Sequence, residues 1–357
     1  MTSSPAPRTG APSVAQSVPP VAVVDHVERA PRLDEGRVVV VGNFDGVHRG
    51  HVRLLSLATE LATSIANSAA TSTGARAPKV TALTFDPHPS VHFSRPAPAL
   101  LTRIERRAEL LTRHGADSVV VQPFDGAFAA LTADAFVREV LVERLCVRGI
   151  VVGHDFRFGA GRAGDLEMLA KAGAGAGFAV RELEAMSDSV DVFSSTRARA
   201  AIVRGDLDDA AAVLGRPHAI EGVVVHGARR GRTIGFPTAN LDAIRELLPR
   251  NGVYAIVVDL VRDDRSSRPL ARGVANVGIR PTIGGDARTT VEAHLFDLDE
   301  RDRDLYGAQL RVHFVARLRD EQKFASFEAL KAQIAADAIV ARAALVAAKP
   351  RDGSGWR

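Results

Sequence analysis

Two histidines, His48 and His51, end the glycine-rich segment 42–51, which reads Gly-Asn-Phe-Asp-Gly-Val-His-Arg-Gly-His. Valines fill 38–41, as in a buried parallel strand, and the residues after the segment have a helical pattern. Both imidazoles are therefore expected near a helix N-terminus, where backbone N–H groups and the helix dipole favour anions. Because the chain has no P-loop sequence G-x-x-x-x-G-K-S/T, this predicts a nucleotide-triphosphate site of another type. A zinc-binding pair, or two surface histidines on a capped helix, are the alternatives.

Three more polar segments of the N-terminal half lie where strands end or helices begin. The sequence Ser-Ser-Thr-Arg-Ala-Arg at 194–199 opens a helix, whose N-terminus is a second candidate anion site. Acidic residues at tight turns often bond backbone amides, so Asp45 and Asp86 have a structural alternative to ligand binding. The glycine-containing segment 153–165 has the alternative of a mobile surface loop. The candidate ligand residues in these segments are Asp86, His88, Asp155, Arg157, Ser194, Ser195, Thr196 and Arg199.

The elements that must position these residues alternate between apolar strands and helical stretches from residue 37 to about 180. This alternation predicts an α/β domain with a parallel sheet and helices on both faces. Ligands of such sheets bind at the carboxyl ends of the strands, and the suspected loops all follow strands. The predicted strands are 38–41, 80–85, 118–121 and 149–152, and the predicted helices are 104–113, 133–145 and 194–205.

The pattern changes after a short helix that Asp206 caps and that Gly215 and Pro217 end. Beyond it, short Val/Ile/Leu-rich strands are separated by Gly, Pro and Asn turns, which predicts a small antiparallel barrel. The predicted barrel strands are 219–225, 252–260, 273–277, 289–295 and 309–318.

A C-terminal helix is predicted at 324–347, packed against the barrel. The residues expected on its packing face are Phe324, Phe327, Leu330 and Ile334. The predicted organisation is a disordered tail at 1–20, an α/β domain at 21–205, a helical linker at 206–217 and a barrel domain at 218–350.

Composition argues for a globular protein that handles small molecules. The 357 residues are 46% hydrophobic and 25% charged, with a net charge of +4 and only 5% aromatic residues. Nucleic-acid binders concentrate Lys and Arg on one face with aromatics for stacking, so phosphorylated small molecules are the better candidates. The single cysteine, Cys146, excludes an internal disulfide framework and is expected to be a buried structural thiol. Neither a membrane span nor a signal peptide is indicated, so the predicted location is the cytoplasm.

The segment 231–241, Gly-Arg-Thr-Ile-Gly-Phe-Pro-Thr-Ala-Asn-Leu, is the most specific part of the second half. Pro237 favours an extended or turn conformation, and in an extended segment Thr238 and Asn240 point to the same side. A hydroxyl and an amide oxygen suit a Mg²⁺ ion that also binds phosphates. The alternative is a glycine-rich hairpin with an ordinary Pro-Thr turn.

Four segments of the first half resemble, in order, the FMN adenylyltransferase module of bacterial bifunctional riboflavin kinase/FAD synthetases. The segments are 42–51, 84–89, 153–165 and 194–199. The first and last resemble the H-x-G-H and S-S-T-x-x-R motifs of the nucleotidyltransferase superfamily. In the second half, 231–241 resembles the riboflavin kinase motif G-R-x-x-G-F-P-T-A-N. The segments that follow in the family's order are 251–255, 276–282, 291–295 and 304–307.

The resemblance implies a Rossmann-like nucleotidyltransferase domain, joined to an antiparallel β-barrel riboflavin kinase domain with a C-terminal helix. His48 and His51 would donate hydrogen bonds to the phosphates of ATP, and a clamp on the leaving pyrophosphate would come from Ser194, Ser195 and Arg199. The residues implied to contact nucleotide or flavin are Gly42, Asn43, Phe44, Asp45, Gly50, Asp86, His88, Asp155, Arg157, Ser194, Ser195, Thr196, Arg199, Gly231, Arg232, Gly235, Phe236, Pro237 and Asn276.

In the barrel, the resemblance makes Glu292 the base that removes the proton from the riboflavin 5′-hydroxyl, with Thr238 and Asn240 binding Mg²⁺–ATP. A glutamate in a strand, taken alone, is more often a surface carboxylate. A primary alcohol needs a base, unlike the FMN phosphate, which is already an anion. Mg²⁺ is implied at both sites, and ATP is the co-substrate.

The sequence therefore predicts one cytoplasmic enzyme that phosphorylates riboflavin to FMN and then adenylylates FMN to FAD. Its partners would be riboflavin, FMN, FAD and ATP, with no nucleic acid and no membrane, and a homo-oligomer stays open. Two alternatives remain: a monofunctional enzyme with one decayed module, and a flavin-binding regulator without catalytic activity.

Overall fold

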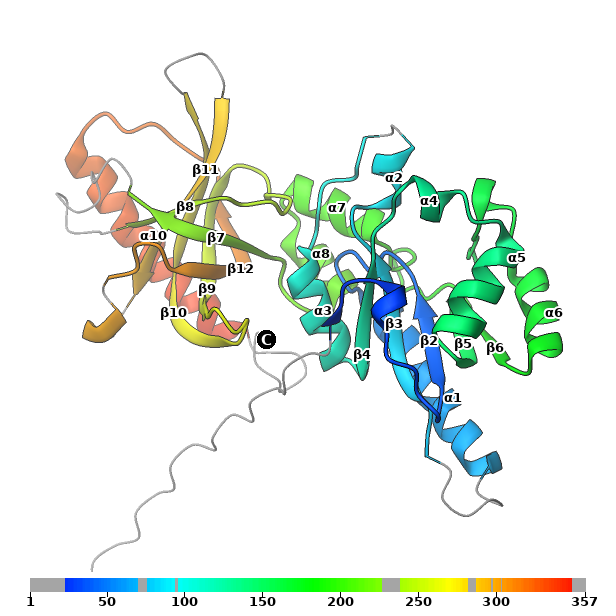
Figure 1. The fold of residues 1–357 in the computed structure, drawn as a ribbon. Helices are drawn as coiled ribbons and strands as arrows, with labels where there is room; N and C mark the ends of the chain where they lie inside the picture. Colours follow the sequence, from blue (N-terminus) through cyan, green and yellow to red (C-terminus); the bar gives the residue numbers. More distant parts are fainter. Residues whose placement is uncertain are drawn as a thin grey trace, which may run out of the picture.

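The computed structural model describes residues 23–69, 76–93, 96–226, 238–281, 287–296, 298–302 and 304–348. They form two domains side by side, an α/β domain and a barrel (Figure 1). The predicted tail at 1–20 lies outside the described residues.

The α/β domain is built on a parallel sheet in the order β1-β4-β3-β2-β5-β6. Its strands are β1 (Val23–Val24), β2 (Arg37–Val41), β3 (Lys79–Phe85), β4 (Ser118–Gln122), β5 (Val147–Gly153) and β6 (Ala179–Leu183). The four predicted strands are confirmed as β2 to β5. The edge strands β1 and β6 were not predicted, because β1 is only two residues long and β6 has no buried residue to give it an apolar run.

Helices cover both faces of this sheet, as predicted. Val38 and Val40 of β2 pack with apolar residues of α1 (Arg49–Ala69) and α3 (Ile104–Arg113), whereas Val39 and Val41 pack on the opposite side. That opposite side is covered by η2 (Phe136–Arg144) and α6 (Leu166–Ala176). The predicted helix 133–145 is instead a short α5 (Ala133–Ala135) that continues as the π-helix η2. The smaller helical elements are η1 (Val27–Arg29), α2 (Pro89–His92), α4 (Gly126–Ala129) and η3 (Ala160–Arg162).

The strand order places the topological switch point between β2 and β5. The chain leaves β2 towards β3 on one side, and it leaves β5 towards β6 on the other. Ligands of open parallel sheets bind beyond the carboxyl ends of the two strands at such a point. The segments that follow β2 and β5 are 42–51 and 153–165, so the topology puts two of the candidate loops at the same edge.

The second domain is a closed antiparallel barrel, as predicted, and its strand order is β10-β11-β8-β7-β12-β9. Its strands are β7 (Ala219–Val225), β8 (Thr238–Asp242), β9 (Gly252–Val261), β10 (Ser267–Pro281), β11 (Ala287–Phe296) and β12 (Gln309–Arg319), with η4 (Glu300–Asp302) between the last two. Alternate residues of these strands, among them Tyr254, Ile256 and Phe314, fill its interior.

The C-terminal helix is α10 (Phe327–Ala347), which begins after the N-cap Ser326. It packs on the barrel through its second half, where Ala341 and Leu345 are buried and Asp337 pairs with Arg319. The prediction that Phe327 lies on the packing face is wrong, since 59% of it is exposed. Leu330 and Ile334, also predicted on this face, are partly buried.

The helices α7 (Ser195–Arg204) and α8 (Leu207–Leu214) lie between the sheet and the barrel in the sequence, and α8 also packs against β12. Among the described residues, ion pairs that join the domains include Arg103 to Glu246, with Nε and Oε1 2.8 Å apart, and Arg311 to Glu109, with Nη2 and Oε2 2.8 Å apart. The single cysteine, Cys146, is partly exposed and unpaired, so the prediction of a buried thiol is wrong. It has a positive φ of 50° directly before β5.

Candidate active sites

His48 and His51 lie at the start of α1, where they were predicted. Their imidazole rings stack, with centroids 3.6 Å apart and 24° between the ring planes. His48 is 7% exposed, and its carbonyl oxygen accepts a hydrogen bond from the N–H of Val52 at 3.0 Å. Both rings therefore lie at the helix end that favours anions.

Both imidazoles are neutral at pH 7. Burial lowers the pKa of His48 to about 4; the nearby Arg216 adds to this shift, and Asp45 opposes it. Burial also lowers the pKa of His51 well below its ordinary value, with further contributions from His48 and two arginines. Nδ1 of each ring is buried and lacks a hydrogen-bond partner among the described residues. A neutral imidazole has one N–H donor, so each ring offers a phosphate a directed hydrogen bond and not a charge.

Two glycines and a phenylalanine make room for these rings. A Cβ atom on Gly50 would lie 3.1 Å from Nδ1 of His48, and one on Gly42 would lie 3.1 Å from the Phe44 ring. The side chain of Phe44, predicted to contact the ligand, is fully buried, and its ring lies edge-on to His51 at 5.0 Å. Gly42, Gly50 and Phe44 thus define the space that the two imidazole rings occupy.

Asp45 joins the first candidate segment to the last. Its carboxylate is 4% exposed and accepts hydrogen bonds from the backbone N–H groups of Leu101 and Thr102 at 2.9–3.1 Å. Nη2 of Arg199 lies 2.5 Å from Oδ2 of Asp45, and the Ser195 hydroxyl donates to the Asp45 backbone oxygen at 2.8 Å. The structural alternative for Asp45 thus fits its surroundings, because protein groups already bind both carboxylate oxygens.

Asn43 and His88 meet on the other side of the same edge, following β2 and β3. The Asn43 amide lies 3.1 Å from Nε2 of His88, whose Nδ1 accepts the N–H of Ser90. Burial is the main cause that lowers the pKa of His88, so the ring is neutral and its proton is on Nε2. This favours the amide orientation in which Asn43 turns its oxygen to His88; the other amide atom is buried and has no hydrogen-bond partner among the described residues. Asp86 is exposed in the same turn.

The remaining predicted residues of this domain are nearer to solvent. Asp155 and Arg157 are exposed in the segment after β5, and Nη1 of Arg157 lies 3.1 Å from a carboxylate oxygen of Asp165. Ser194 is the N-cap of α7 and accepts the Arg197 N–H at 3.1 Å, while Thr196 is exposed in the first turn. The start of α7 lies beside the start of α1, since a Cβ on Gly50 would be 3.7 Å from the Phe193 carbonyl oxygen.

An aromatic cluster that the sequence analysis missed lies at the carboxyl ends of β3 and β4. Phe124 is central to it, with ring centroids 5.6–6.1 Å from four other rings. Phe93 is 53% exposed at its rim. The four rings are those of Phe85, His92, Phe93 and Phe128. A signal was present, since phenylalanines are concentrated between residues 85 and 158 although aromatics are rare in the chain.

The barrel brings the predicted residues of the second site onto one outer face. Asn240 of β8 is directly opposite Glu292 of β11, which is in turn opposite Asn276 of β10. Thr238 is opposite His294, so Thr238 and Asn240 share a side, as predicted. Directly opposite residues of antiparallel strands have Cβ atoms about 4.5–5.5 Å apart. Asn276 also donates to Oε1 of Glu321 at 3.1 Å.

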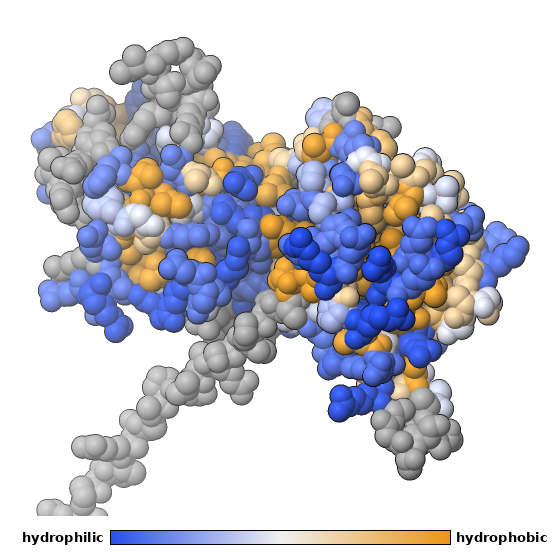
Figure 2. Space-filling view, in the orientation of Figure 1, coloured by the Kyte–Doolittle hydropathy of each residue, from blue (hydrophilic) through white to orange (hydrophobic). Residues whose placement is uncertain are grey.

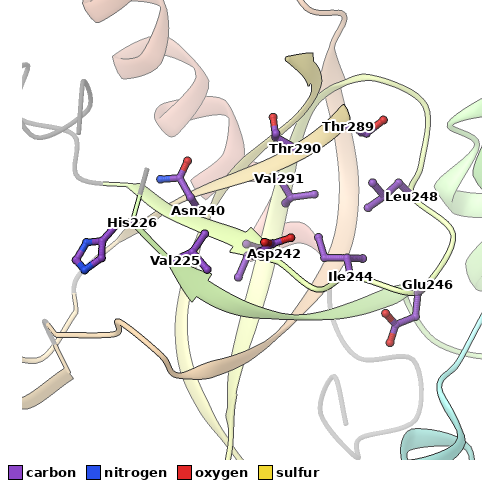
Figure 3. A pocket seen from close by; sticks show the side chains of 11 residues that line it. Val225, His226, Asn240, Asp242, Ile244, Glu246, Leu248, Thr289, Thr290 and Val291 are labelled. Atoms are coloured by element: carbon purple, nitrogen blue, oxygen red, sulfur yellow. The ribbon is translucent and has the colours of Figure 1, made fainter. Parts of the chain in front are cut away.

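A cavity of about 220 Å³ lies beside Asn240. Figure 3 shows His226 and Asn240 at one end of it, Thr289 and Leu248 at the other, and Thr290 of β11 between them. Asp242, on the same face of β8, adds a carboxylate. The predicted residues Gly231, Arg232, Gly235, Phe236 and Pro237 lie outside the described residues.

Comparisons with known proteins match both halves of the chain. The family model of FAD synthetase matches residues 30–197, and that of riboflavin kinase matches residues 214–345. The bifunctional riboflavin kinase/FMN adenylyltransferase of Escherichia coli (strain K12) is 42% identical over 328 residues, 92% of this chain and 98% of that protein. This chain belongs to the bifunctional riboflavin kinase/FMN adenylyltransferase family. The member from Pseudomonas fluorescens is 40% identical over 310 residues, 86% of this chain and 93% of that protein.

The family's two-domain fold also recurs in a crystal structure described as that of a macrolide-efflux protein from Streptococcus pneumoniae. The TM-score is 0.76 at 30% identity, over 90% of this chain and 99% of that one. On the face of this chain that Figure 2 shows, hydrophilic residues cover much of both domains, and hydrophobic residues form separate groups. Within the described residues, no helix is both long and apolar enough to cross a membrane.

Proposed function

We propose that this chain makes both flavin cofactors: the barrel phosphorylates riboflavin with ATP, and the α/β domain transfers AMP from a second ATP to the FMN. Membership of the family supports both activities. One observation carries the proposal: on each domain, residues suited to the proposed reaction lie close together. His48 and His51 lie beside the start of α7, and Asn240 and Glu292 are direct neighbours on the barrel.

For adenylyl transfer, a phosphate oxygen of FMN attacks the α-phosphorus of ATP, and the bond to the departing pyrophosphate breaks. The attacking group is already an anion, so the site needs positioning and charge stabilisation rather than a base. The neutral His48 and His51 would donate hydrogen bonds to the triphosphate, and Arg199 would supply positive charge to the pyrophosphate. Asn43, which follows β2 and contacts His88, would add an NH₂ donor.

The FMN ring system would lie on the aromatic cluster around Phe124. Aromatic pairs prefer offset-stacked or edge-to-face arrangements at these ring separations, and Phe93 presents an exposed ring at the rim. The cluster and the histidine pair lie at the same edge of the sheet. Asp155 and Arg157, in the segment after β5, would contact adenosine or FMN.

For riboflavin phosphorylation, Glu292 would take the proton from the riboflavin 5′-hydroxyl. The hydroxyl oxygen would attack the γ-phosphorus of ATP, and ADP would leave. General-base assistance of this kind contributes about 10²–10⁴-fold to the rate. Thr238 and Asn240, on the same outer face, supply the neutral oxygen ligands that suit Mg²⁺. When bound, Mg²⁺ would neutralise phosphate charge at this site and, with ATP, at the adenylyl-transfer site.

The test is to incubate the pure protein with riboflavin, ATP and Mg²⁺ and to separate the flavins. We expect FMN followed by FAD. Glu292→Ala should abolish FMN formation but still convert supplied FMN to FAD, whereas His51→Ala should stop at FMN. His154→Ala, which changes an exposed histidine after β5, is the matched control and should make both products.

The two alternatives predict different products. FMN without FAD from the wild-type protein would mean a decayed adenylyltransferase, and neither product would favour a flavin-binding regulator. The domain limits at 205 and 218, the cytoplasmic location, the absence of a nucleic-acid partner and any homo-oligomer remain predictions.

A further inference from the structure

Arg216 connects the two domains at the adenylyl-transfer loop. It lies in the short connector between α8 and β7, and its guanidinium reaches back to the loop that follows β2. Nη2 donates to the carbonyl oxygen of Gly46 at 2.6 Å, and Nη1 donates to that of Val47 at 3.0 Å. These two carbonyls directly precede His48 in the chain.

The loop that Arg216 holds has an unfavourable backbone. Phe44, Gly46 and Val47 have φ angles of 50°, 85° and 41°. A positive φ is a genuine outlier for a β-branched residue such as Val47. For Phe44 and Val47, backbone of this kind is strained and persists only where its surroundings fix it. Thr102 holds the N–H of Gly46 from inside the α/β domain, while Arg216 holds the carbonyl side next to His48.

His218, two residues after Arg216 in the connector, contacts the barrel domain. Nε2 of His218 lies 2.7 Å from the carbonyl oxygen of Leu247, and its ring faces Phe314 of the barrel with centroids 6.4 Å apart. His218 is 2% exposed. Arg216 and His218 therefore tie a single short segment to the transferase loop on one side and to the barrel on the other.

Arg216 carries its charge at pH 7, although its surroundings disfavour it. Burial, followed by repulsion from Arg106, Arg113 and Arg311, lowers its pKa to about 9. Its hydrogen bonds to described residues go to carbonyl oxygens, those of Gly46, Val47 and Leu214. The guanidinium is near enough to lower the pKa of both His48 and His51.

We propose that Arg216 is a positioning residue for adenylyl transfer, which fixes the backbone at Gly46 and Val47 so that His48 and His51 face the nucleotide phosphates. The proposal rests on the adenylyltransferase activity proposed above. Arg216 lies outside the segment that matches the FAD synthetase model and inside the one that matches the riboflavin kinase model. The adenylyl-transfer site is thus completed by a residue from the kinase segment.

The experiment compares Arg216→Met with Arg216→Lys in the full chain, measuring FAD formation from FMN and riboflavin phosphorylation on the same samples. A misplacement of about 1 Å can cost about 10²-fold in rate, so we expect Arg216→Met to lower kcat for FAD formation by about 10- to 100-fold. KM for ATP should change much less than kcat, and riboflavin phosphorylation should not change. Lysine can still donate to both carbonyls, so Arg216→Lys should recover most of the loss.

Arg103→Met is the matched control, because Arg103 crosses the same domain junction to Glu246 and Glu221 without contacting the loop. It should keep FAD formation. The proposal is overturned if Arg216→Met makes FAD at the wild-type rate, if both activities fall together, or if Arg103→Met loses as much FAD formation as Arg216→Met. A wild-type protein that makes no FAD would instead contradict the proposed adenylyltransferase activity.

Discussion

Replacing Asp45 by asparagine tests whether this buried carboxylate organises the adenylyl-transfer site. The Asp45 carboxylate faces Arg199 at 2.5 Å and Arg107 at 3.7 Å, and it accepts the N–H groups of Leu101 and Thr102. Asparagine keeps the shape but offers one acceptor oxygen, and its NH₂ group would face donors. Two arginines would be left beside the site without their countercharge.

The expected magnitude follows from the burial of the pair. Removing one partner of a buried ion pair costs about 3–5 kcal/mol. The lower end applies, because 18% of the Arg199 side chain is exposed. For a domain of this size about 3 kcal/mol lowers the midpoint of thermal unfolding by roughly 6–12 °C. Release of Arg199 and Ser195 should also reduce FAD formation by about 10²-fold, while riboflavin phosphorylation is retained.

The assay is thermal unfolding together with both enzyme activities, measured well below the transition. Asp337→Asn is the matched control: Asp337 is 5% exposed and pairs with Arg319 through both oxygens, between α10 and the barrel. It should lower thermal stability without lowering FAD formation. If Asp45→Asn left the unfolding midpoint and FAD formation at wild-type values, the role assigned to the Asp45 carboxylate would be refuted.

Three further predictions address the metal, the flavin ring and pH. Asn240→Ala should raise the Mg²⁺ concentration needed for riboflavin phosphorylation but not for FAD formation; identical Mg²⁺ titrations of variant and wild type would contradict this. Phe124→Leu should raise KM for FMN and leave KM for ATP unchanged, because leucine cannot stack on a ring; an unchanged KM for FMN would rule out the aromatic site. Burial is the main cause that lowers the pKa of His48 and of His218 to about 4. Each histidine therefore stabilises the folded state fully above pH 6.5, and this stabilisation is lost as the pH falls towards 4. Between pH 7.5 and 5.5 the free energy of unfolding should fall by about 1.3 kcal/mol per histidine. Denaturant unfolding at both pH values should show a smaller difference in His218→Gln, and equal differences would count against the prediction.

Local sequence determined the elements and the order of the candidate segments. The valines at 38–41 alternate between two core clusters, and such a run predicts a buried strand wherever the partners lie. Because polar loops after parallel strands share one edge, the grouping of 42–51 with 84–89 also followed from the sequence. Likewise, the period of two along β8 put Thr238 and Asn240 on one side.

Tertiary structure alone decided what each polar group contacts. Asp45 meets residues 101 and 102, more than fifty positions away, and Arg216 meets Gly46 across 170 positions, which no local pattern encodes. The burial of Phe327 and that of Cys146 were mispredicted for the same reason, since burial depends on the partner surface. Residue types and their spacing thus determined which chemistry this chain can perform. Long-range contacts decided which of those residues face the ligand and which hold the others in place, because folding brings distant segments together.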